Sequence, residues 1–155
     1  MNQKEIDEFV QLLEKYELSI ADLYETFASM LPQSRDAWMS FVKEEHLHAK
    51  WIGQLQALLK NETISFEQKT YTLQATKTAI NYLEKQIEQV KRDKPDLLQV
   101  LNIAIDIEKS LLESAFLRVF KLNGPKAQKI QARLEKATKI HADRLIDWRA
   151  DMQKA

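Results

Sequence analysis

Apolar residues recur every three or four positions along most of the chain, which is the spacing of one face of a helix. The first run is Ile6, Val10, Leu13, Ile20, Tyr24, Phe27 and Leu31. The second run is Trp38, Phe41, Ile52, Leu55 and Leu59. We expect the second helix to begin near Ser34 and to end before Asn61. Asn2 and Glu5 have the spacing of a capping box at the start of the first helix.

Three more runs of the same kind follow. The third is Leu73, Ile80, Leu83, Ile87 and Val90. The fourth is Leu97, Leu101, Ala104, Ile105, Leu111, Ala115, Val119 and Leu122. The fifth is Ile130, Leu134, Ala137, Leu145 and Trp148. Because Ser65 and Gln68 also have capping-box spacing, the third run predicts a helix from about residue 66 to 92.

Prolines separate these segments and indicate how they connect. Pro32, Pro95 and Pro125 each fall between two runs, where a helix has to stop. Very short turns at Leu31–Ser34 and Leu122–Pro125 predict two antiparallel helix hairpins, and the segment 60–94 is long enough to cross back over a bundle. The sequence therefore predicts an all-α fold, a ferritin-like four-helix bundle of two hairpins with a helical crossover. Residues 1–155 form one domain in this prediction.

Composition narrows the chemistry that this fold can carry. Lysine plus arginine and aspartate plus glutamate both number 23, so the formal charge is zero, and neither a nucleic acid nor an anionic membrane is the expected partner. The sequence contains no cysteine, so a metal would have to be held by Glu, Asp and His. No apolar run has the length of a signal peptide or a membrane span, and we expect a cytoplasmic protein.

Two of the three histidines lie in the stretch VKEEHLHAK at 42–50. Glu45 and His48 fall on the inner stripe of the second helix, whereas His46 falls outside it and is expected to face solvent. Reflecting position 45 through the first hairpin turn gives Glu17, a carboxylate within the apolar stripe of the first helix. Glu25 lies off that stripe, and Glu17 is therefore the preferred partner.

The second hairpin repeats this arrangement. Glu108 interrupts the apolar stripe of its helix, and reflection through residue 123 gives position 138, with His141 one turn beyond. The sequences HAKWI at 48–52 and HADRL at 141–145 indicate a weak internal duplication. Thr138 stands where that duplication would place a glutamate. Glu135, one turn earlier, is an alternative donor, although an exposed helix position is the simpler interpretation for it.

Three carboxylates and two imidazoles are thus predicted at one level of the bundle. Buried carboxylates are costly unless something compensates their charge, and a divalent metal would do so. The alternative is a polar layer of hydrogen-bonded Glu, His and Tyr side chains that fixes the register of the helices. Trp38, Trp51 and Trp148 are interpreted as core or seam aromatics.

The sequence resembles the rubrerythrin branch of the ferritin-like superfamily. The segments that carry the resemblance are ELSIADLYETFA at 17–28, WMSFVKEEHLHAKWI at 38–52 and AIDIEKSLLES at 104–114. They are similar to the family's first-helix Glu with a following Tyr and Phe-Ala, its second-helix Glu-X-X-His and its third-helix Glu. The resemblance extends over nearly the whole chain.

The resemblance implies specific roles for the predicted residues. Glu17 and Glu108 would be terminal ligands, Glu45 a bridging ligand, and His48 and His141 one imidazole for each metal. Tyr24 would be a hydrogen-bond partner behind the ligands.

The chain also departs from the family pattern. Thr138 replaces the second bridging Glu, and Leu111 stands where rubrerythrins have an extra carboxylate. No cysteine-rich rubredoxin module follows in this sequence. An external electron donor is therefore expected if the site is redox-active.

Two classes of function follow. The first is a protein with one or two iron ions per chain, zinc or manganese being the alternative metals, and oxidase or peroxidase chemistry at a degenerate dimetal site. The second is a mononuclear site without redox turnover, or a purely structural or interaction bundle with a polar core layer. A homodimer is compatible with either class.

Overall fold

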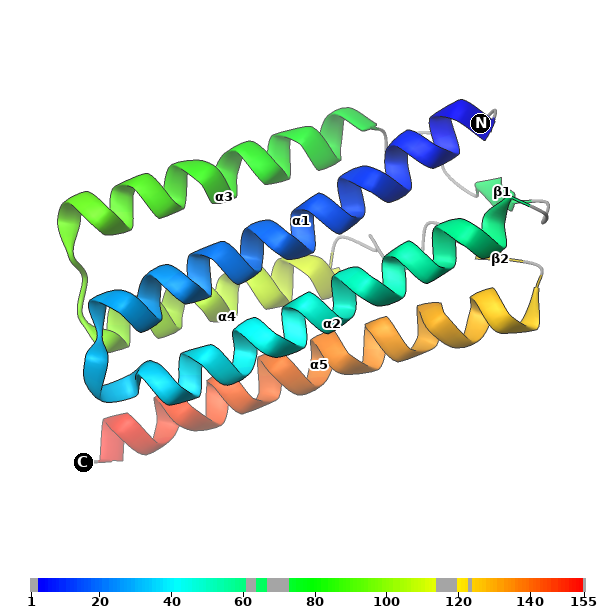
Figure 1. The fold of residues 1–155 in the computed structure, drawn as a ribbon. Coiled ribbons are helices and arrows are strands. Elements are labelled where there is room, and N and C mark those ends of the chain that lie inside the picture. The colour runs from blue at the N-terminus through cyan, green and yellow to red at the C-terminus, as the bar shows by residue number, and fades with distance from the viewer. Residues whose placement is uncertain (1–2, 61–63, 67–72, 114–119, 123, 155) are drawn as a thin grey trace.

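A computed structural model describes residues 3–60, 64–66, 73–113, 120–122 and 124–154. Nearly all of the described chain is helical (Figure 1), which confirms the predicted all-helical class. The helices are α1 (Gln3–Met30), α2 (Arg35–Leu59), α3 (Leu73–Asp93), α4 (Leu97–Glu113) and α5 (Pro125–Lys154). A short 3-10 helix, η1 (Pro32–Ser34), forms the turn between α1 and α2.

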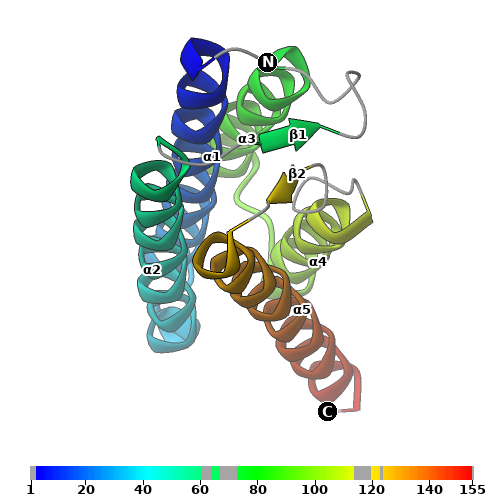
Figure 2. The same ribbon diagram turned by 90° about the vertical axis from the view of Figure 1, so that its right-hand side faces the viewer.

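The five helices lie along one long axis, and consecutive helices run in opposite directions (Figure 1). The α1/α2 pair and the α4/α5 pair lie on opposite sides of the molecule, and α3 lies beside α1 (Figure 2). Contacts between α2 and α5 join the two pairs. Because α3 runs back towards the end where α1 turns into α2, α4 begins at that end (Figure 1).

Two short strands, β1 (Ile64–Phe66) and β2 (Phe120–Leu122), pair antiparallel near the end of α2 and the start of α5 (Figure 2). This ladder was not predicted. The sequence predicted a helix continuing to Leu122, which instead lies in β2 opposite Ile64. Both segments alternate apolar and polar residues over only three positions, a length at which a strand cannot be distinguished from part of a helical stripe.

The structure contradicts one predicted helix start and agrees with one predicted helix end. Ser65 lies in β1 and α3 begins at Leu73, so the capping-box interpretation of Ser65 and Gln68 is wrong. Asn2, Gln68, Ala115 and Val119 lie outside the described residues. The second helix does end before Asn61, at Leu59.

The connection between α3 and α4 is closed by local hydrogen bonds. Lys94 adopts a left-handed conformation with φ of 46°, and its backbone N–H donates to the Val90 carbonyl at 3.0 Å, which ends α3. Asp96 and Gln99 each accept a hydrogen bond from the backbone N–H of the other, both at 2.9 Å. This reciprocal cap begins α4 directly after Pro95.

Most predicted stripe residues form the core. An aromatic group at the α1–α2 turn end centres on fully buried Trp38, which contacts the rings of Tyr24, Phe27, Phe41 and Trp148 at centroid distances of 4.9–5.9 Å. Such ring pairs contribute about 0.5–1.5 kcal/mol each beyond burial, so this group fixes α1, α2 and α5 against one another. Among the described residues, no helix has both the length and the apolar character needed to cross a membrane.

Candidate metal centre

All five residues predicted as ligands are buried, and they come from four helices. Their exposed fractions are Glu17 3%, Glu45 1%, His48 3%, Glu108 1% and His141 2%. Glutamate is almost never this buried unless its charge is compensated. The burial therefore requires contacts among these side chains or with something that binds between them.

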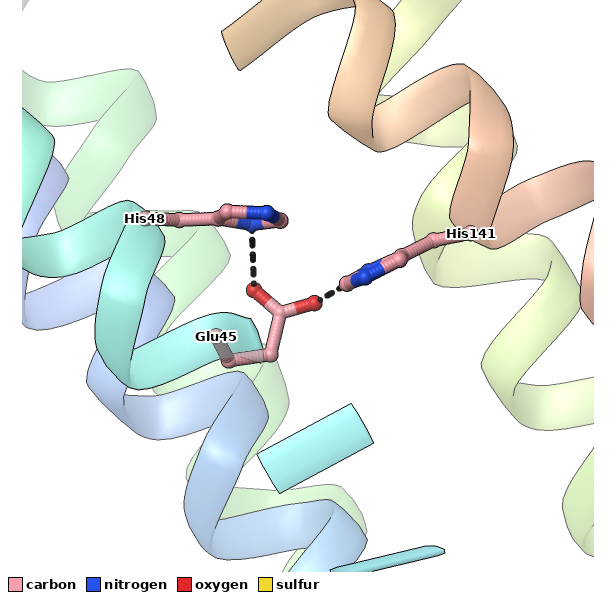
Figure 3. Close-up of side chains that lie close together, drawn as sticks. All are labelled: Glu45, His48 and His141. Atoms are coloured by element: carbon pink, nitrogen blue, oxygen red, sulfur yellow. Dashed lines mark hydrogen bonds and ion pairs between the residues drawn. The ribbon is translucent and has the colours of Figure 1, made fainter. Parts of the chain in front are cut away.

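Glu45 lies between His48 and His141 (Figure 3). Its Oε1 lies 2.8 Å from His141 Nδ1 and its Oε2 lies 3.3 Å from His48 Nδ1. The two imidazole centroids are 4.8 Å apart. One carboxylate therefore spans two imidazoles from different helices, α2 and α5.

A second glutamate flanks each imidazole. Glu17 Oε2, from α1, lies 4.0 Å from His48 Nδ1, and Glu108 Oε1, from α4, lies 3.5 Å from His141 Nδ1. We call Glu17, His48 and Glu45 Oε2 the His48 half-site, and Glu108, His141 and Glu45 Oε1 the His141 half-site. Each half-site combines one imidazole, one glutamate of its own and one oxygen of the shared Glu45.

Tyr24 lies behind the His141 half-site. Its hydroxyl donates a hydrogen bond to Glu108 Oε1 at 2.7 Å. Burial, together with the neighbouring Glu108 carboxylate, raises the pKa of Tyr24 well above its ordinary value, so the phenol keeps its proton and acts as a donor. The sequence predicted a hydrogen-bonding role for Tyr24 at this site, and its contact is with one of the predicted ligands.

Thr138 is buried on α5, one turn before His141, with 3% exposure. Its hydroxyl donates to the Leu134 carbonyl at 2.9 Å, so the proton of this side chain is used within its own helix. Glu135 is partly exposed and lines a surface pocket with Lys109 and Lys139. His46 is exposed, as predicted.

Sequence reasoning missed Glu44 and Arg144. Glu44 Oε2 lies 2.9 Å from His141 Nε2 and accepts a hydrogen bond from Arg144 Nη1 at 2.5 Å. Glu44 has a side-chain exposure of 39% and lies off the inner stripe, so apolar periodicity gave no reason to select it. The available signal was the pair of consecutive glutamates at 44 and 45, with Arg144 one turn after His141.

Burial and mutual repulsion shift the ionisation of the carboxyl groups. Burial raises the pKa of Glu17 well above its ordinary value, and the Glu45 charge raises it further. Burial and then the Glu108 charge raise the pKa of Glu45 to about 7. The metal-free cluster therefore retains protons that exposed carboxyl groups would have lost at neutral pH.

The two histidines shift in opposite directions. Burial lowers the pKa of His48, although the Glu17 charge opposes this effect. Burial would also lower the pKa of His141, but hydrogen bonds to the Glu108 and Glu45 carboxylates outweigh it and raise the pKa to about 10. A protonated His141 thus compensates part of the carboxylate charge when no metal is bound.

The donor set fits a divalent metal. Ligand atoms of Glu45, His48 and His141 all lie within 4.8 Å of one another. Two such atoms bound to one ion at about 2.1 Å can be at most about 4.2 Å apart, so small side-chain rotations would bring all three to a single ion. Two imidazoles and a carboxylate are a set that binds zinc or non-haem iron.

The pKa shifts predict how the stability of the metal-free protein depends on pH. Between pH 6.5 and about 10, the folded state holds a proton on His141 that the unfolded state has lost. Stability should therefore fall with rising pH, by about 1.4 kcal/mol per pH unit for one proton. The raised pKa of Glu45 acts in the same direction up to about pH 7. The lowered pKa of His48 acts in the opposite direction, but only below pH 6.5.

Urea unfolding of chelator-treated protein between pH 7 and pH 9 measures this slope. The His141→Gln variant should lose the part of this decrease that the titrating ring supplies. Stability that is flat or rises across this range in the unchanged protein would contradict the assignment of the proton to His141.

Comparisons with known proteins give no match. No protein-family model matches the chain, and neither a curated protein sequence nor a solved structure matches it. The function of the cluster must therefore be inferred from its own residues and their geometry.

Proposed function

We propose that this chain is a rubrerythrin-like protein of the ferritin-like superfamily that binds non-haem iron between α1, α2, α4 and α5. Carboxylate-bridged dimetal bundles take one glutamate from each of two helices and a Glu-X-X-His motif from each of the other two. Here Glu17 on α1 and Glu108 on α4 are the single glutamates, and Glu45 with His48 on α2 is a complete motif. On α5, His141 is present and Thr138 stands in the place of its glutamate. The helix directions in Figure 1 are those of two hairpins joined by a crossover.

The position of Glu45 is the observation that carries the proposal. Its two oxygens point to different imidazoles, at 2.8 and 3.3 Å (Figure 3). A carboxylate in this position can bridge two ions or bind one in either half-site. Glu17 and Glu108 then supply a terminal oxygen on each side.

We take iron as the redox-active ion of this proposal. Imidazole suits iron and zinc, carboxylate suits manganese and magnesium, and a mixture of two histidines with carboxylates is typical of non-haem iron. Bound iron would supply electron transfer to dioxygen or peroxide, with electrons from an external donor protein. The protein's own residues hold and orient the ligands: Tyr24 fixes Glu108 at 2.7 Å. The rings of Phe41 and Trp51 pack against those of His141 and His48, with centroids 5.2 and 5.4 Å apart.

Redox chemistry is tested by loading the protein with Fe²⁺ without oxygen and then adding hydrogen peroxide. We expect oxidation of the bound iron, seen as new near-ultraviolet absorption, and repeated consumption of peroxide when a chemical reductant is supplied. The zinc-loaded protein should show neither effect. If the iron-loaded protein consumes no more peroxide than the zinc-loaded protein, the oxidoreductase part of the proposal is wrong, while metal binding is judged separately by metal content.

A second candidate is a polar layer without a metal. It is favoured by two hydrogen bonds that are present without a metal, from Tyr24 to Glu108 at 2.7 Å and between His141 and Glu45 at 2.8 Å. The two candidates differ in how the melting temperature responds to metal. A ligand present at 100 times its Kd stabilises the folded state by about 2.7 kcal/mol, so a metal site predicts a marked increase in Tm with Fe²⁺ or Zn²⁺. A polar layer predicts no change.

A further inference from the structure

The outward ring nitrogen of His141 has a partner that the proposed site does not use. His141 Nε2 lies 2.9 Å from Glu44 Oε2, on the side of the ring opposite to the Glu45 contact of Nδ1. Glu44 and Glu45 are consecutive on α2, yet their surroundings differ: the Glu45 side chain is 1% exposed and that of Glu44 is 39% exposed. One imidazole from α5 is therefore held between two neighbouring carboxylates of α2.

Arg144 fixes Glu44 in this position. Its Nη1 donates to Glu44 Oε2 at 2.5 Å, and its Nη2 lies 3.4 Å from Ser40 Oγ. Its guanidinium carbon also lies 4.3 Å from the centre of the Phe41 ring. Arg144 is one turn after His141 on α5, so the pair of residues holds Glu44 from two successive turns of that helix. Arginine suits this role because its donors form a rigid, planar group.

The contact with Glu44 affects which ring nitrogen of His141 can bind a metal. A histidine binds a metal through a ring nitrogen without a proton, and the hydrogen bond made by the other nitrogen decides which one that is. An ionised Glu44 can accept a hydrogen bond from a ring nitrogen that carries a proton, but it has no proton to donate to a bare ring nitrogen. Both ring nitrogens of His141 face a carboxylate, Nε2 facing Glu44 and Nδ1 facing Glu45. When a metal replaces the proton on Nδ1, Glu44 keeps the remaining hydrogen on Nε2, so Nδ1 is the nitrogen that binds.

We propose that Glu44, held by Arg144, is a positioning residue that fixes the ring orientation and tautomer of His141 so that Nδ1 binds the metal. This inference rests on the proposed metal site and adds the group that prepares one of its ligands. Glu44 itself acts through His141 and does not contact the metal.

The test compares Glu44→Ala and Glu44→Gln with the unchanged protein, using Zn²⁺ as the probe and a chelator competition to measure affinity. Loss of a partner of this kind costs about 10- to 100-fold in metal affinity, and we expect that loss for alanine. Glutamine keeps an acceptor oxygen but loses the charge, so it should retain most of the affinity. Glu25→Ala, which removes an exposed glutamate on the neighbouring α1, is the control and should change nothing.

Nitrogen-15 NMR of the histidine rings gives a second measurement, and a change in protein stability alone would not alter its result. In the zinc-loaded unchanged protein and in Glu44→Gln, His141 should carry its hydrogen on Nε2 and bind zinc through Nδ1. In Glu44→Ala the Nε2–H signal should weaken through exchange with solvent. Arg144→Met, which keeps the apolar stem and removes the donors, should show a smaller loss of affinity than Glu44→Ala.

Four results would overturn the inference, and the last of them would also overturn the proposed function. Zinc bound through Nε2 of His141 would reverse the assigned roles of the two nitrogens. Equal losses for alanine and glutamine would mean that only the charge of Glu44 matters. If the unchanged protein binds zinc tightly and Glu44→Ala binds it equally well, Glu44 has no role in positioning His141, and the proposed function is unaffected. Absence of zinc binding by the unchanged protein would instead contradict both.

Discussion

Replacing Glu45 by glutamine should weaken metal binding in both half-sites, whereas replacing His48 or His141 by alanine should weaken mainly one. Glu45 is the only residue placed in both half-sites, with one oxygen near each imidazole at 2.8 and 3.3 Å. Glutamine has nearly the same shape but carries no charge, and its nitrogen cannot bind a metal. Changes to residues behind the ligands already cost about 10- to 100-fold in affinity, so loss of a direct ligand should exceed this.

Equilibrium dialysis with Zn²⁺ or anaerobic Fe²⁺, followed by elemental analysis, measures the ions retained per chain. The Glu45→Gln variant should retain the least, and each histidine variant should retain more metal than Glu45→Gln, because one half-site keeps all of its ligands. Glu25→Gln is the matched control, because Glu25 is an exposed glutamate on α1. If Glu45→Gln and His48→Ala retain as much metal as the control, the cluster is a polar layer and not a metal site.

Replacing Thr138 by glutamate should increase the number of ions that the protein holds tightly. Two divalent ions bring four positive charges, and Glu17, Glu45 and Glu108 supply three negative ones. Threonine adds no charge, and its hydroxyl proton is already donated to the Leu134 carbonyl at 2.9 Å. The unchanged protein should therefore hold one ion firmly and a second weakly. A glutamate at 138 would complete Glu-X-X-His on α5 and supply the fourth charge.

The comparison is an anaerobic iron titration of both proteins, followed by exposure to oxygen. The Thr138→Glu variant should approach two irons per chain and oxidise Fe²⁺ faster than the unchanged protein. Thr138→Gln controls for the larger side chain at this buried position, 3% exposed, and should show neither gain. Two tightly bound irons in the unchanged protein, or no gain in Thr138→Glu, would show that position 138 is not the missing ligand.

For the first hairpin, the sequence was sufficient to place Glu17 beside Glu45 and His48, for a physical reason. A helix advances 1.5 Å per residue, and the α1–α2 turn is short, so reflection through the turn places Glu17 at the level of Glu45. The structure places Glu17 Oε2 4.0 Å from His48, one turn beyond Glu45. Apolar stripes also indicated which side chains face inward, because a carboxylate within such a stripe has to be buried.

The features that the sequence did not predict depend on contacts between distant segments, which the spacing of apolar residues does not indicate. Glu44 and Arg144 lie off the inner stripes, and their role follows only from the packing of α2 against α5, which brings both within reach of His141. The β1–β2 ladder arises from two segments more than fifty positions apart in the sequence, and each is too short to show a strand pattern of its own. The predicted continuation of the fourth helix to Leu122 failed for this reason.

Metal binding by the buried cluster of Glu17, Glu45, His48, Glu108 and His141 is the property on which the proposed function depends. Its most direct measurement is the iron retained per chain after anaerobic loading with Fe²⁺ and removal of free metal by desalting, with a His48→Ala, His141→Ala double variant treated in parallel. We expect the unchanged protein to retain about one iron per chain, as a site with one complete Glu-X-X-His motif predicts, and the double variant to retain almost none. An unchanged protein that loses its iron as completely as the double variant would contradict metal binding by this cluster.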